Sequence, residues 1–224
     1  MSKHLERDLE ALEREILAQS SIVEEMIGMA SRALCDRRPD IAIELAAKEP
    51  NINWREVEIE EECLKILALH QPVASDLRRT AMVLKINSDL ERIADLAVNV
   101  AERSRAIAEL PELEVPEKLE MMASVAINMV HDALDAFVDL DPNAARDVCR
   151  RDDVVDDFNR EVIDELLAVM RSRSELIEPA LQFFSASRHI ERIADHATNI
   201  AEDVIYLVEG EIARHHRYKH AGRH

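Results

Sequence analysis

The chain carries one twelve-residue segment twice, and this duplication constrains its fold more than any other feature. Residues 91–102 read ERIADLAVNVAE, and residues 191–202 read ERIADHATNIAE. Nine of the twelve positions are identical at an offset of 100 residues, where unrelated segments would share about one. The acidic and amide positions are repeated as faithfully as the apolar ones. The sequence therefore predicts two copies of one helical unit, each with a polar face and a core face.

Amino-acid usage assigns this unit to an all-α fold. Aromatic residues make up 3% of the 224 residues, and there are only 3 glycines. Strands draw on aromatic and β-branched residues, whereas Leu, Ala, Glu and Arg, in which this chain is rich, favour helices. An aliphatic core shared by long helices is expected.

Prolines and polar breaks divide the apolar periodicity into six predicted helices. These cover residues 4–35, 40–70, 73–109, 117–140, 143–172 and 175–209. Pro50 predicts an early kink or a short break in the second helix, because proline lacks a backbone donor and clashes with the preceding turn. Two prolines within residues 110–116 mark a boundary. We predict two tandem, structurally similar three-helix bundles, residues 1–110 and 111–212, followed by a mobile basic tail, residues 213–224.

Charge and cysteine usage narrow the function classes. The formal net charge is −18, whereas binding to nucleic acid requires a basic surface, so no nucleic-acid partner is expected. The 3 cysteines include no CxxC pair, which indicates free thiols in a reducing compartment. The N-terminal segment is charged from its start, and no run approaches the ~20 apolar residues of a membrane span. A cytoplasmic protein is expected.

The first predicted helical hairpin brings polar pairs from two helices side by side. If it turns at Pro72, Glu91 lies level with Asn53, and Asp95 lies level with Glu49. Acidic pairs four residues apart are common on solvated helix faces, and that interpretation stays open. However, such a pair costs ~0.2–0.5 kcal/mol of helix stability, and no cation occupies the helical positions that would offset Glu91. The recurrence of the pair in the duplicate therefore favours a functional role.

The second hairpin repeats the arrangement with four acids. It turns at residues 173–174 and places Asp152 and Asp156 beside Glu191 and Asp195. Clustered carboxylates repel one another unless protons or cations neutralise them. Oxygen-rich clusters suit hard or borderline cations such as Mg, Ca, Mn or Fe.

The clusters are expected on the outside of the bundle. The inward stripe of the third helix consists of Leu90, Ile93, Ala97 and Val100. At ~100° per residue, Glu91 and Asp95 lie more than a right angle from this stripe. A buried catalytic di-metal centre would place its ligands inside the bundle.

Other polar residues carry weaker signals. His189 and His196 flank the second copy, but Asp89 and Leu96 replace them in the first copy. We therefore expect these histidines to be solvated and at most optional ligands.

The tip of the first hairpin is a predicted partner contact. Asp76, Arg78 and Arg79 follow Pro72 in the first turns of the third predicted helix. A partner could reach them there without disturbing the core. An ordinary helix start is the alternative.

The sequence resembles the PhoU family of phosphate-signalling regulators. The matching pieces are QPVASDLRR (71–79), LERIAD (90–95), its copy IERIAD (190–195), and CRRDDVVDDFNREV (149–162). The resemblance covers residues 4–210 and implies two similar three-helix bundles side by side.

The resemblance also implies a function and a set of ligands. A cytoplasmic, non-enzymatic regulator would repress phosphate-starvation genes when phosphate is ample. Its partners would be a phosphate ABC transporter ATPase and a sensor histidine kinase, and a homodimer is expected. Family members bind metal ions, including iron or zinc clusters, through E(D)xxxD motifs. These motifs carry over to Glu91/Asp95, Asp152/Asp156 and Glu191/Asp195.

The pair Glu49/Asn53 departs from the family motif, because Asn replaces an acid. The first site is therefore expected to be the weaker of the two. The identity of the ion stays open among Fe, Zn, Mn and Mg.

Three alternative functions also stay open. A carboxylate-bundle enzyme of the ferritin-like type would need Glu-x-x-His on inward faces, and no histidine here follows a glutamate at that spacing. The acidic faces could instead be solvated surfaces of a structural scaffold. The chain could also regulate a different phosphate permease.

Overall fold

The computed structural model describes residues 3–210, and within this range the chain forms helices and no β-strand. The helices are α1 (Lys3–Cys35), α2 (Pro39–Ala46), α3 (Glu49–His70), α4 (Ala74–Ala108), α5 (Glu117–Asp139), α6 (Pro142–Ser172) and α7 (Ile177–Glu209), with a short 3-10 helix, η1 (Ser174–Leu176), before α7. The all-α prediction is confirmed. The predicted tail, residues 213–224, lies outside the described residues.

The six predicted helical segments are present, and the second is divided at the expected proline. α2 ends where Lys48 N donates to Leu45 O at 2.9 Å. Pro50 then lies in the first turn of α3. Its fixed φ and missing N–H suit a helix start, but they prevent α2 from continuing through this point.

Two helix ends are closed by residues whose capping chemistry is local. The Asp141 side chain accepts hydrogen bonds from Asn143 N at 2.8 Å and from Ala144 N at 3.2 Å, so it caps α6 ahead of Pro142. Gly210 closes α7 with φ 74°, and its N–H donates to Tyr206 O at 2.9 Å. Glycine adopts this left-handed conformation without the steric cost of a Cβ.

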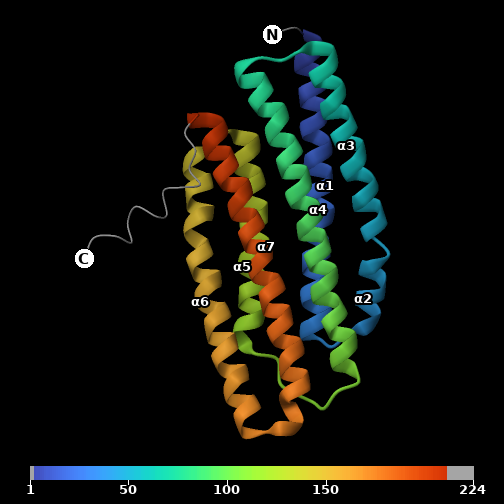
Figure 1. The fold of residues 1–224 in the computed structure, drawn as a ribbon, viewed down its shortest axis with the longest axis vertical. Coiled ribbons are helices and arrows are strands. Elements are labelled where there is room, and N and C mark those ends of the chain that lie inside the picture. Colours follow the sequence, from blue (N-terminus) through green and yellow to red (C-terminus); the bar gives the residue numbers. More distant parts are fainter. Residues whose placement is uncertain (1–2, 211–224) are drawn as a thin grey trace, which may run out of the picture.

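The two repeats lie side by side along their length (Figure 1). The group α1 to α4 forms one side of the molecule, and α5 to α7 form the other. The α3–α4 turn lies at the top of the view and the α6–α7 turn at the bottom. α4 and α7 therefore run antiparallel where they meet at the centre.

One continuous apolar core joins the repeats. The predicted inward stripe of α4 is fully buried at Leu90, Ile93, Ala97 and Val100. Val100 also lines a small internal void together with Ile27 of α1, Ala123 of α5 and Ile190 of α7. Side chains from both repeats thus pack against one another.

Two polar pairs span the same contact between α4 and α7. Lys85 Nζ lies 2.7 Å from the buried Asp203 Oδ1. Further along, His196 Nδ1 lies 2.8 Å from Asp89 Oδ1. These pairs fix the register of the two central helices.

Among the described residues, only α5 has the length and hydropathy of a membrane-spanning helix. The mean hydropathy of its most apolar window is 1.2, and half of that window is buried inside the bundle. The packing of α5 against α6 and α7 accounts for this apolar character.

Candidate functional site

α6 and α7 bring the four acids of the second predicted cluster within electrostatic reach of one another. Asp195 keeps part of its surface exposed to solvent. Partial burial of its carboxyl group raises its pKa to about 6, with further contributions from Asp152, Glu191 and Asp156. Each neighbouring carboxylate disfavours the charged form of Asp195, as expected for acids that share one site. Their role as metal ligands stays a prediction.

Neighbouring side chains partly compensate this negative charge. Asp152 is buried, and its Oδ1 accepts a hydrogen bond from Thr198 Oγ1 at 3.3 Å. Arg188 Nη1 lies 2.5 Å from Glu191 Oε2. Repulsion from the other three acids still contributes to the raised pKa of Asp195, so this compensation is incomplete.

The first cluster is built from α3 and α4. The pKa of Glu91 is raised, mainly by burial and then by Asp95, and Glu56 of α3 adds to the shift. Arg92 opposes it, because its guanidinium lies 3.4 Å from Glu91 and 3.6 Å from Asp95. The expectation that no cation offsets this pair is therefore wrong. An arginine next to Glu91 in sequence reaches both carboxylates.

The sequence reasoning missed Glu56. Asn87 Nδ2 donates to Glu56 O at 2.8 Å, which places this turn of α3 beside the start of the duplicated motif. Glu49 is half-buried and Asn53 is exposed on the preceding turns. The signal was available, because Glu56 lies seven residues after Glu49 and hence on the same helix face.

α3 and α6 are equivalent at an offset of 103 residues, which aligns their buried positions. The aligned buried pairs are Ile52 with Val155, Ile59 with Val162, and Cys63 with Leu166. The same offset aligns Glu49, Asn53 and Glu56 with Asp152, Asp156 and Asn159. Each of these two sets of three residues contains two acids and one amide. The presence of Asn53 in place of an acid therefore does not by itself leave the first repeat with fewer acids than the second.

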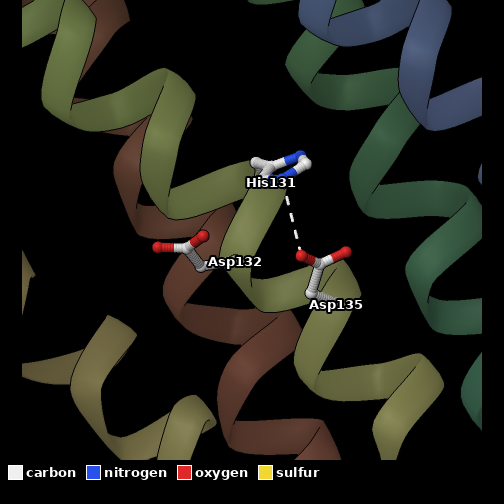
Figure 2. Close-up of side chains that lie close together, drawn as sticks. All are labelled: His131, Asp132 and Asp135. Atoms are coloured by element: carbon white, nitrogen blue, oxygen red, sulfur yellow. Dashed lines mark ion pairs between the residues drawn. The ribbon is translucent and has the colours of Figure 1, made fainter.

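A different group is the most compact set of possible metal ligands in the described part of the chain. His131, Asp132 and Asp135 of α5 hold one ligand atom each within 4.8 Å of one another (Figure 2). No three of the predicted acidic ligands gather as closely within residues 3–210. An ion at the predicted clusters would therefore have to draw their carboxylates together.

The α5 group is already engaged in ion pairs at the surface. The His131 ring lies 3.3 Å from Glu24 and 3.4 Å from Asp135, while Asp132 pairs with Arg151 at 2.6 Å. Exposed pairs of this kind contribute little and compete with a bound ion for the same atoms. We interpret the group as a surface ion-pair network.

The expectation that the two histidines near the second motif are solvated is wrong. His196 pairs with Asp89 across the repeat contact. His189 is half-buried, and its ring lies 3.4 Å from Ser185 Oγ. Burial lowers the pKa of His189, and Arg103 lowers it further. Both rings thus have partners that the sequence pattern did not reveal.

The three residues of the predicted partner contact have different surroundings. Arg79 pairs with Glu13 of α1, which ties the start of α4 to the bundle. Asp76 is partly buried, and its carbonyl accepts a hydrogen bond from Thr80 Oγ1 at 3.0 Å. Arg78 is exposed and is the residue that a partner could reach.

Comparison with known proteins agrees with this duplicated architecture. The PhoU domain model matches residues 16–104 and again residues 119–204. A PhoU homolog of Deinococcus radiodurans is 36% identical, with 94% of this chain and 99% of the homolog covered. One from Aquifex aeolicus is 37% identical over 96% and 98% of the two chains. Both are described as accessory proteins of a phosphate-specific transport system.

Solved structures show the same fold. The crystal structure of PhoU from Pseudomonas aeruginosa has a TM-score of 0.87 at 38% identity, with 92% of this chain and 99% of that chain covered. The PhoU structure from Streptococcus pneumoniae also has a TM-score of 0.87, at 29% identity over 93% and 98% of the two chains. The fold therefore defines a protein of two similar three-helix bundles in tandem. The chain belongs to the PhoU family.

Proposed function

We propose that this protein is an accessory regulator of phosphate uptake that acts by contact with partner proteins and has no turnover of its own. The observation that carries the proposal is the match of the PhoU domain to both repeats, together with relatives described as accessory proteins of phosphate-specific transport. The proposed partners are the transporter ATPase and a sensor histidine kinase in the cytoplasm. The net charge of −18 favours basic partner surfaces, because opposite fields speed and orient encounter.

Phosphate-responsive reporter output tests the regulatory part. Deleting this protein should release the reporter from repression at high phosphate, and re-expression of the wild-type chain should restore repression. Arg78→Glu should weaken repression while leaving helical content unchanged, with the exposed Arg105→Glu as a matched control elsewhere on α4. Unchanged repression and uptake in the deletion strain would remove the regulatory proposal.

The second part of the proposal is that the acidic clusters hold cations such as Fe, Zn, Mn or Mg. Its support is the position of the four acids on two facing helices, where Asp152, Glu191 and Asp156 each add to the effect of burial in raising the pKa of Asp195. A cation between carboxylates removes this repulsion. Carboxylate oxygens are the preferred ligands of Mg and Mn, and they also occur among the ligands of Zn and Fe.

Metal analysis of purified variants tests this site against the group on α5. Glu191→Ala with Asp195→Ala should lower the bound metal. The paired control, His131→Ala with Asp135→Ala, should leave it unchanged. If only the control variant loses metal, the metal site is the group on α5. If both variants retain metal, the acidic faces are solvated surfaces and do not bind it.

A further inference from the structure

The outer face of α3 exposes a row of large apolar side chains. Trp54, Val57 and Leu64 are 58%, 51% and 53% exposed. Glu61 lies between Val57 and Leu64 in this row, and Ala68 ends it. The five residues are spaced alternately by three and four positions, which is the spacing of one side of a coiled-coil seam. We call these five residues the α3 seam. α3 lies at the outer edge of the bundle (Figure 1), and it packs against α1 and α4 through the opposite face, which carries Ile52 and Ile59. Of the seam residues, Glu61 also borders the groove between α3 and α1.

The fold itself does not require this seam. α6 occupies the equivalent place in the second repeat, and its positions at the offset of 103 are Asp157, Arg160, Asp164, Leu167 and Arg171. Three of the four apolar members of the seam are thus charged in the duplicate. On the opposite face, Ile52, Ile59 and Cys63 of α3 and their equivalents in α6 are all buried. The apolar row is therefore a property of α3 and not of its place in the bundle, and exposed apolar rows mark interaction surfaces.

Charge around the seam selects the kind of partner. Glu58 and Glu60 are exposed at positions that flank the seam, and Glu61 lies within it. The flanking cation Lys65 is already paired with Glu62. In paired helices, the flanking positions set partner choice through opposite charges. A matching partner helix would carry Lys or Arg at its own flanking positions, on either side of its own apolar row.

We propose that the α3 seam is the docking site for a basic amphipathic helix of a partner protein. The proposal deepens the proposed function, on which it rests, by assigning a surface to the partner contact. The apolar row supplies the contact area, and the three glutamates exclude acidic helices with a similar apolar row.

A second copy of this chain fits the seam poorly. The seam runs from Trp54 to Ala68, so Glu61 is at its middle. A parallel, in-register pair of α3 helices would place Glu61 against Glu61, and so would an antiparallel pair centred on that residue. Like charges opposed in this way are destabilising.

The single tryptophan of the chain reports on the seam directly. The probe is a synthetic amphipathic peptide of about three heptads with Leu in its apolar row and Lys at the flanking positions. The comparison peptide carries Glu in place of Lys. The Lys peptide should shift Trp54 emission to shorter wavelength and bind more weakly at high salt. The Glu peptide should do neither.

Matched variants in the two repeats separate specific docking from general attraction to an acidic protein. Leu64→Asp should weaken peptide binding by about tenfold or more. Leu167→Asp, at the equivalent position of α6, should bind like the wild type. Both leucines are exposed, so circular dichroism should show an unchanged fold. Equal binding of the two peptides, or equal effects of the two variants, would overturn the proposal.

Two further measurements complete the test. A concentration-dependent dimer that Leu64→Asp abolishes in sedimentation equilibrium would make a second copy the occupant and would overturn the proposal. In the reporter strain, Leu64→Asp should relieve repression and Leu167→Asp should not. If deletion of the protein relieves repression but Leu64→Asp does not, the docking site is wrong and the regulatory function stands. If deletion has no effect, the regulatory function itself is wrong.

Discussion

Asp195 shows how a single carboxyl group links the acidic cluster to stability. Its folded pKa of about 6 exceeds the ordinary value of 3.8 because of burial and three neighbouring acids. The folded state therefore holds this proton more tightly than the unfolded chain does. As pH rises from about 4 to 6, the unfolded chain loses the proton first, and folding becomes less favourable. Above pH 6 the whole penalty is present.

Replacing this carboxyl by an amide should remove the penalty. Asp195→Asn should raise the melting temperature of the metal-free protein at pH 7 by about 1–3 °C, since solvent exposure screens the repulsion. At pH 4 the gain should disappear. Thermal melts with chelator across this range measure it, and the exposed Asp153→Asn is the control. A gain of the same size at pH 4 and pH 7 would contradict the electrostatic explanation.

The sequence marks the acids of the predicted clusters more clearly than it marks the residues around them. Repetition marks Glu91 and Glu191, because the same letters recur at a fixed offset. It does not mark Glu56, whose equivalent is Asn159. The contact between Asp89 and His196 depends on how the two repeats pack against each other. The residue pattern along a single helix contains no information about that packing.

At the scale of elements, helix ends were predictable and helix partners across the repeats were not. Pro50, Asp141 and Gly210 act through local backbone chemistry, so their effects can be inferred from a few residues. The pairing of α4 with α7 is a tertiary property. Lys85 illustrates this, because it reaches Asp203 from a position 118 residues away in the chain.

Removing that lysine should loosen the contact between α4 and α7. Lys85→Met leaves the buried Asp203 carboxylate without its ammonium partner and should cost about 1–3 kcal/mol in free energy of unfolding. Lys85→Arg keeps the charge and should cost less. Urea denaturation measures both values. Equal stability of Lys85→Met and the wild type would show that the pair contributes nothing.

At the scale of the whole molecule, the covalent boundary and the packing boundary differ. Two prolines separate the repeats near residues 110–116, yet the apolar core is continuous across them. The connection is also held in place, because Arg37 Nη2 donates to Leu113 O at 2.5 Å. Each repeat therefore uses the other to cover the central faces of its helices.

The shared core predicts that the repeats fold as one unit. Calorimetry of the full chain should give a single transition with equal calorimetric and van't Hoff enthalpies. A fragment of residues 1–110 would expose the apolar side of α4 around Ile93 and Val100, which is fully buried in the whole chain. Since an exposed patch of this kind promotes association, the fragment should lose helix or self-associate, as circular dichroism and sedimentation would show. Two separate transitions, or a fragment that is monomeric and fully helical, would contradict this prediction. Each bundle would then be stable alone, and the contact between α4 and α7 would join two independently folded domains.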